Sequence, residues 1–363
     1  MALRALSAVL LLWLVCTAAA WLAIPALRHT EATVWGNSAL IPPFEKPARA
    51  ADYLLRGIWQ RYDALWYQRI AERGYEDIST PFYPLLPMAA AALHRIGVPM
   101  DWAVLWASRI AAWLAVWGLL RLARLDGDDH TARRAILYWL CWPMSFILLA
   151  GYAEPFLVAA MTWSLVFARG GAWWPASACA VLACLARSTG AAIVPALYWL
   201  AWRGKPVRGG PLALATAGPL LYPAYLKLSG LMLPAESYPL YWRTEASAPW
   251  TTLLAAFRAL GSDHAAFVVF NLSAVVLVSL FVFAAGVRTE YKVLAGLMVL
   301  FLLMAKTTPP LHSMMRYSLA VFPAFLALAA RVRAPWAVLL TASVFGLLNL
   351  LLLVFFFDWA YIV

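Results

Sequence analysis

The chain has 363 residues, of which 64% are hydrophobic and only 12% are charged, and its formal net charge is +11. An average soluble domain is about half apolar and a quarter charged, so this composition excludes a soluble enzyme, a disordered protein and a nucleic-acid-binding protein. It is typical of an all-α integral membrane protein, in which the position of the basic residues along the chain carries the information.

Eleven segments are apolar enough to be predicted as membrane-spanning helices, for which about 20 mostly apolar residues are needed. The first apolar run is long for a signal peptide. No small-x-small cleavage site is followed by a soluble body, so we expect a retained helix there. Several of the later segments are short for a bilayer. The segments are 5–27, 102–120, 135–150, 153–168, 172–186, 189–202, 211–229, 265–286, 293–306, 317–330 and 335–357.

The charges predict which ends of these helices face the cytoplasm. If the N-terminus is cytoplasmic, the inner segments contain 13 basic and 4 acidic residues, whereas the outer segments contain 14 basic and 13 acidic residues. Because basic residues are enriched in cytoplasmic loops, this pattern predicts a cytoplasmic N-terminus and an external C-terminus. The chain is then a single transmembrane domain, residues 1–363, with long outer loops at 28–101 and 230–264.

The first outer loop contains a different kind of helix. Residues 50–73 place apolar side chains on one face at helical spacing, which predicts an amphipathic helix in the membrane surface, and residues 88–97 are a second candidate. Asp63 falls just past the edge of this apolar face. The pattern leaves two interpretations: a solvated carboxylate paired with Arg56 or Arg69, or a carboxylate that points from the interface into a cavity.

The cysteines and histidines do not indicate a metal centre or a disulfide framework. All four cysteines lie in predicted spans, where core packing is their expected role, and the five histidines show no ligand spacing. The sequence contains neither a Walker loop nor a strand-linked GxGxxG motif. A nucleotide cofactor is therefore not expected.

Four unusual segments follow one another along the chain: RYDALWYQRIAERGY (61–75) with FYPLLP (82–87), WPMSFILLAGYAEPF (142–156), LARSTG (185–190), and HSMMRYSLAVFPAFLALA (312–329). Together they resemble motifs of the PIG-V family, the GPI mannosyltransferase II group, and its bacterial relatives. Tyr62 stands where the family usually has Trp, and Met315 replaces a Pro that is usual in the bacterial members.

This resemblance implies a GT-C fold and a membrane glycosyltransferase. Such an enzyme takes a sugar, with mannose favoured here, from a polyprenyl-phosphate carrier and transfers it with inversion to an acceptor hydroxyl. The reaction takes place on the non-cytoplasmic side, which for a bacterial homologue is the outer face of the inner or plasma membrane. The implied acceptor is a glycolipid, a glycan or a protein. By motif position, Asp63 is the catalytic base.

The resemblance also implies partners for this base. Arg316 and Arg187 are expected to hold the donor phosphate, because a planar guanidinium donates two parallel hydrogen bonds; the alternative is an interface anchor. Glu154 is expected to be a second catalytic carboxylate that orients the acceptor or an arginine; the alternative is a turn carboxylate capping a helix. No metal is predicted as required, and a divalent ion shared by Asp63 and Glu154 is the alternative. Further donor-binding candidates are His312, Lys306, Tyr83, Tyr152, Tyr317 and Arg109.

Two other functions compete with this hypothesis. A lipid or sugar transporter, such as a flippase, often has two related halves and ionisable residues near the bilayer centre. We find no internal repeat, and the ionisable residues collect at the outer helix ends, which favours an enzyme. A GT-C enzyme that uses a prenyl-phosphate linked to glucose, arabinofuranose or an aminosugar also fits, because only the family resemblance favours mannose.

Overall fold

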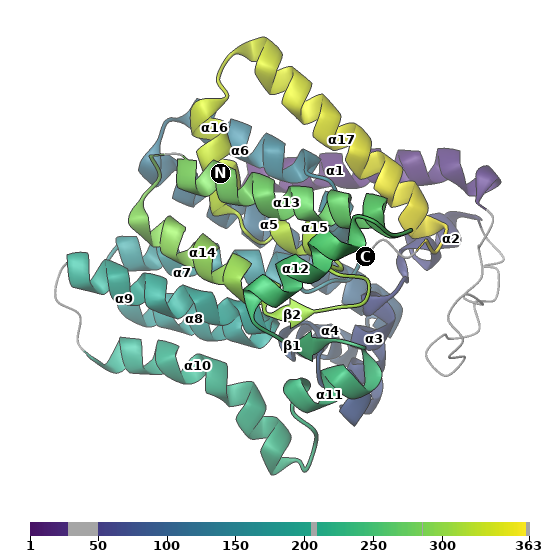
Figure 1. The fold of residues 1–363 in the computed structure, drawn as a ribbon, viewed down its shortest axis with the longest axis horizontal. Coiled ribbons are helices and arrows are strands. Elements are labelled where there is room, and N and C mark those ends of the chain that lie inside the picture. Colours follow the sequence, from purple (N-terminus) through teal and green to yellow (C-terminus); the bar gives the residue numbers. More distant parts are fainter. Residues whose placement is uncertain (28–49, 205–208, 285, 361–363) are drawn as a thin grey trace.

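A computed structural model describes residues 1–27, 50–204, 209–284 and 286–360. Residues 28–49 of the predicted first outer loop and residues 205–208 of an inner loop lie outside the described residues. Within the described part the chain is almost entirely helical (Figure 1), which confirms the predicted all-α membrane fold. The helices are α1 (Ala2–Ala23), α2 (Ala50–Leu55), α3 (Asp63–Arg73), α4 (Leu85–Arg95), α5 (Met100–Asp126), α6 (Asp129–Cys141), α7 (Glu154–Arg169), α8 (Trp173–Ala186), α9 (Ile193–Arg203), α10 (Gly209–Leu228), α11 (Pro234–Tyr241), α12 (Pro249–Ala259), α13 (Ala265–Ala284), α14 (Thr289–Leu303), α15 (Met314–Ser318), α16 (Pro323–Arg331) and α17 (Pro335–Phe357).

Each of the eleven predicted spans contains helix, but they differ in length. Among the described helices, α1, α5, α13 and α17 are long and apolar enough to cross a membrane by themselves. Several predicted spans are not continuous α-helix. In 135–150, α6 ends just before Pro143, because a residue preceding proline is disfavoured in helical conformation, and a 3-10 turn over Ser145–Leu149 follows. The span 317–330 is divided between α15 and α16.

The segment 50–73 is not one surface helix, which corrects the prediction. It divides into α2, a 3-10 turn over Gly57–Trp59 and α3, and the chain turns sharply at Tyr62, where φ is +51°. The aromatic face is buried against the end of α17: Trp59 meets Phe357 edge-on at 5.2 Å between ring centroids, and Tyr62 contacts Phe356. Aromatic contacts within the protein, which bury large areas, have replaced the expected contact with lipid.

Helix α7 lies in the middle of the bundle and packs against both α5 and α8. A Cβ atom on Gly118 of α5 would lie 2.4 Å from Oγ1 of Thr162 on α7, so only glycine allows this approach. This close packing holds α7, whose first residue is Glu154, against α5.

The elements α2, α3, α4 and α11 gather at one end of the bundle, toward the right of Figure 1. Beside them is a small antiparallel sheet in which β1 (Glu245–Ala246) pairs with β2 (Ala305–Lys306). The described helices and strands of the two predicted outer loops named here therefore lie in one region, and the candidate site lies among them.

Candidate active site

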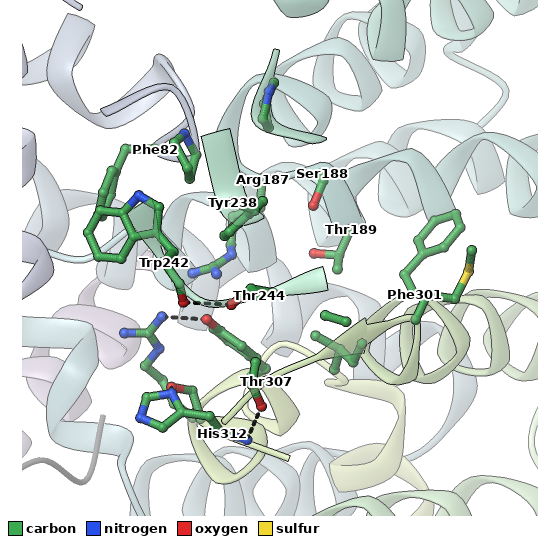
Figure 2. Close-up of a pocket in the computed structure, with 18 of the residues that line it drawn as sticks. Phe82, Arg187, Ser188, Thr189, Tyr238, Trp242, Thr244, Phe301, Thr307 and His312 are labelled. Atoms are coloured by element: carbon green, nitrogen blue, oxygen red, sulfur yellow. Dashed lines mark hydrogen bonds between the residues drawn. The ribbon is translucent and has the colours of Figure 1, made fainter. Parts of the chain in front are cut away.

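A cavity of about 400 Å³ lies among these elements (Figure 2). Trp242 and Phe82 form one end of it, and Phe301 lies at the opposite end, beyond Thr189. Next to Phe301 in the chain, the lining residues Leu302, Met304 and Ala305 are also apolar. The charged and aromatic residues that line it are Tyr62, Asp63, Tyr67, Phe82, Tyr83, Arg187, Tyr238, Trp242, Glu245, Phe301, His312, Arg316 and Tyr317.

Asp63 is the first residue of α3 and faces the cavity, with 21% of its side chain exposed. The turn at Tyr62 lies in a region of backbone conformation that non-glycine residues rarely adopt, and strain of this kind is concentrated at functional sites. The positive end of the helix dipole favours a carboxylate in the first turn. Burial nevertheless raises the pKa of Asp63, against the opposing effects of Arg316 and Arg187.

Arg316, on α15, joins two carboxylates that come from distant parts of the chain. Its Nη1 donates a hydrogen bond to Oδ2 of Asp63 at 2.9 Å, and its Nε lies 3.1 Å from Oε1 of Glu154. Its Nη2 donates to the hydroxyl of Tyr317 at 3.0 Å. Burial alone would lower the pKa of Arg316, but the carboxylates of Asp63 and Glu154 hold it well above the usual range, so the guanidinium remains charged.

Glu154 and Arg187 complete a network of four alternating charges. Nη1 of Arg187 donates to Oε1 of Glu154 at 2.6 Å, and Arg187 also stacks on the ring of Tyr317 at 4.5 Å. Glu154 is fully buried and does not line the cavity. It lies behind the two guanidinium groups and orients them, whereas Asp63, Arg187 and Arg316 reach the cavity.

Two glycines make the turns that present this network. Gly190 follows the chain reversal after Arg187, and a Cβ there would lie 2.0 Å from the carbonyl oxygen of Ala183, so no other residue fits. Gly151 precedes Glu154 and has φ of +77°. Its missing side chain leaves room for Val104 and for Ala64, the residue after Asp63.

Gly151→Ala is expected to destabilise the protein more than Gly230→Ala does. Both glycines have positive φ, +77° and +70°, but a Cβ at Gly230 meets nothing within 4 Å, whereas one at Gly151 would lie 2.8 Å from Cγ1 of Val104. Backbone strain is common to both, and overpacking adds about 1–3 kcal/mol at Gly151 alone. Thermal unfolding in detergent measures the difference, and equal midpoints for the two variants would contradict this account.

The remaining predicted donor-binding residues separate into two groups. Tyr83, His312 and Tyr317 line the cavity. Three others do not: Lys306 forms a partly exposed ion pair with Glu245 across the two-stranded sheet at 3.6 Å, Tyr152 is buried, and Arg109 lies deeper in α5. The first group alone is placed to contact a ligand in this cavity.

Tyr152 and Arg109 have other contacts. The hydroxyl of Tyr152 donates to the carbonyl of Arg61 at 3.3 Å, and its ring supports the guanidinium of Arg316 at 5.2 Å. Nε of Arg109 donates to the carbonyl of Leu149, at the end of the 3-10 turn that follows α6. A cation at the negative end of such a turn is electrostatically favourable. Both residues therefore support neighbouring parts of the site and do not reach the cavity.

His312 is held neutral at the edge of the cavity. Burial, followed by the nearby charge of Arg316, lowers the pKa of His312 to about 4. Its Nδ1 lies 2.8 Å from the hydroxyl of Ser313, and its ring stacks on Phe267. A neutral imidazole adds no positive charge for a phosphate, so His312 is placed to supply a hydrogen bond only.

Several cavity residues were not among the predicted site residues. Tyr67 lies inside the first motif, one helical turn after Asp63, but the motif implies no role for it. Tyr238 and Trp242 come from the second outer loop, whose richness in aromatic residues was the only signal. Trp242 is fixed by a hydrogen bond from its Nε1 to the carbonyl of Ile78 at 2.9 Å and by edge-on packing against Phe82. These rings supply flat apolar surfaces beside the charged network.

The described residues contain no group of three or more His, Cys, Asp or Glu side chains placed to hold a metal ion. Between Asp63 and Glu154, the two carboxylates considered for a shared divalent ion, the guanidinium of Arg316 makes the connection. An ion shared by these two side chains would have to displace that guanidinium.

Comparison with known proteins shows the fold. No protein-family model matches the chain, and no curated protein sequence matches it. Among solved structures, the chain is similar to the crystal structure of ArnT from Cupriavidus metallidurans bound to undecaprenyl phosphate, with 12% sequence identity and a TM-score of 0.51. The match covers 98% of this chain and 76% of that chain. The chain shares the fold of that structure, the GT-C fold, in an all-α integral membrane protein.

Proposed function

We propose that this protein is a membrane glycosyltransferase that moves a sugar from a polyprenyl-phosphate carrier to an acceptor hydroxyl. The observation that carries the proposal is the ion pair at 2.9 Å between Asp63 and Arg316 at the cavity wall, backed by Glu154 and Arg187. A base beside a strong phosphate-binding group is what this reaction requires. The GT-C fold, shared with an enzyme solved with undecaprenyl phosphate, supports the same class of donor.

The proposed reaction is a direct displacement with inversion at the anomeric carbon. The acceptor oxygen forms the new bond to C1 of the sugar while the bond from C1 to the phosphate oxygen breaks. The electron pair of that bond leaves on the polyprenyl phosphate, and the acceptor proton passes to the carboxylate of Asp63. One carboxylate is sufficient, because phosphate departs without a strong general acid.

Arg316 and Arg187 are the proposed phosphate ligands in this scheme. The charge that develops on the departing phosphate is stabilised by cations fixed in advance in a poorly solvated site. Glu154 keeps the two guanidinium groups in place and compensates their charge. Its proposed contribution is therefore positioning, and direct contact with the acceptor is not part of the mechanism.

The proposed sugar and the proposed side of the membrane rest on two different features of the sequence. We infer mannose as the transferred sugar from the resemblance to the PIG-V family, and we infer an outer-facing site from the distribution of charge. The flat surfaces of Trp242 and Tyr67 beside Asp63 suit the apolar face of a hexose. The acceptor that we propose is a glycolipid, a glycan or a protein of a bacterial inner or plasma membrane.

The decisive test uses the purified full-length protein in detergent. It would be incubated with polyprenyl-phosphate mannose and, in parallel, with carriers of glucose, arabinofuranose and an aminosugar, each with a panel of acceptors. We expect acceptor-dependent release of polyprenyl phosphate and a mass increase of one sugar on the product, most rapidly with mannose. A transporter would release no polyprenyl phosphate with any donor, and that result would overturn the proposal.

The pH dependence of transfer is expected to reflect the burial of Asp63. Because burial raises the pKa of this carboxyl and the base must be ionised to accept a proton, kcat/KM falls as the pH falls through that raised pKa. The acidic limb should therefore lie above the pKa of about 3.9 of an ordinary aspartate. A pH profile of kcat/KM measures it, and full activity down to that value would contradict the assignment.

A further inference from the structure

Helix α12 directs its apolar side chains away from the rest of the protein. Trp250, Leu254 and Phe257 follow one another at intervals of four and three residues, so they share one helix face, and they are 72%, 49% and 60% exposed. The opposite face, which packs against the protein, contains the buried Thr252 and Ala256. A helix on a water-exposed surface has the reverse arrangement, with its apolar stripe toward the core.

This outward apolar face continues the surface of neighbouring spans. Helix α12 packs against α13 and α14, and it lies across them at the front of the molecule in Figure 1. Helix α13 is one of the long apolar helices, and its Val269 is 54% exposed. On α14, Leu300, which does not line the cavity, is also exposed. An exposed apolar surface of this extent in an integral membrane protein fits lipid hydrocarbon.

The same helix is joined to the wall of the cavity. Strand β1, shortly before α12, pairs with β2, and the amide of Ser247 donates to the carbonyl of Met304 at 2.8 Å. Ala246 and Met304 both line the cavity. The position of α12 therefore determines where this part of the wall stands relative to the bundle.

We propose that Trp250, Leu254 and Phe257 are inserted in the lipid leaflet on the cavity's side of the membrane, and that this insertion holds β1 and β2 in place as the wall of the cavity. The partner of the helix is the hydrocarbon of that leaflet, in the manner of an amphipathic interfacial helix. The link to transfer rests on the function proposed above: a carrier whose chain stays in the same leaflet reaches the cavity beside this wall.

Spin labelling tests the insertion without any assay of activity. Nitroxide labels would be attached through Leu254→Cys and Phe257→Cys in the full-length protein in liposomes, with the unsubstituted protein as the background for its own cysteines. Thr251→Cys, exposed at the edge of the apolar face, is the matched control. We expect the first two labels to collide more with dissolved oxygen than with a water-soluble nickel chelate, and Thr251→Cys to show relatively more collisions with the chelate.

Two results would overturn the insertion. Dominant collisions with the nickel chelate at Leu254→Cys would show a face in water. Weak collisions with both reagents would show a face covered by protein, such as a second copy of this chain.

A second experiment tests whether insertion of α12 holds strands β1 and β2 in place. In a Trp250→Ser/Phe257→Ser variant, a label at Ala246→Cys on β1 is expected to become more mobile, and the KM for the carrier-linked sugar in liposomes should rise several-fold with little change in kcat. Leu339→Ser/Leu340→Ser on α17, where both side chains are exposed, is the matched control and should change neither. Unchanged mobility at Ala246→Cys would overturn the proposal that insertion of α12 holds β1 in place. The label reports mobility even in a protein without transferase activity, so failure of this proposal can be told apart from failure of the proposed function.

Discussion

Replacing Asp63 by asparagine is expected to reduce sugar transfer by about 10²- to 10⁴-fold, the contribution that a positioned general base makes. The amide keeps the shape of the side chain and can still accept a hydrogen bond from Arg316, which lies 2.9 Å from the carboxylate. It cannot take the acceptor proton. Binding of the donor, measured separately, should change far less than turnover does.

The matched control for this variant is Glu72→Gln. Glu72 lies on the same helix as Asp63 but is exposed at its far end. Loss of this surface charge should leave transfer within about twofold of the parent protein, because exposed charges contribute little. Near-normal transfer by Asp63→Asn in a folded, donor-binding protein would remove the base from the proposed mechanism.

Replacing Arg316 by alanine is expected to affect both transfer and folding. The variant leaves Asp63 and Glu154 without the guanidinium that contacts both of them, and breaking a buried ion pair by removing one partner costs about 3–5 kcal/mol. Transfer should fall by at least about 100-fold, because the departing phosphate loses a charge-assisted contact. Thermal unfolding and a donor-binding assay measure the two effects.

A double variant separates these effects from each other. In Arg316→Met/Glu154→Gln the buried negative charge of Glu154 is removed together with the cation, so part of the lost stability should return through coupling between contacting residues. Transfer should not return. Arg133→Ala, at an exposed pair with Asp129, is the control and should leave the stability nearly unchanged. Recovery of transfer in the double variant would show that Arg316 has only a structural role.

The charged residues of the candidate site were more predictable from the sequence than the aromatic residues around them. The distribution of charges placed Asp63, Arg187 and Arg316 on one side of the membrane, and the structure brings them into one network with Glu154. This pairing follows because an arginine or carboxylate within apolar sequence needs a partner, so a small number of charges had few ways to pair.

The contacts made by the aromatic segments were less predictable. The helical spacing of apolar residues in 50–73 correctly predicts the two short helices α2 and α3. The break before Asp63, however, depends on packing against Phe356 and Phe357, almost 300 residues later. Likewise, nothing in the sequence around Trp242 specifies its hydrogen bond to the carbonyl of Ile78. Periodicity identifies an apolar face, whereas the surface that covers that face is decided by tertiary packing.

The charge network also has a consequence for biogenesis. Asp63 and Arg316 are 253 positions apart, so ribosomes deliver the carboxylates of Asp63 and Glu154 well before their shared cation. During that interval neither acid has this counter-ion, and desolvating an unpaired carboxylate is costly. We therefore expect that a chain terminated before α15 would lack the cation that joins these two carboxylates.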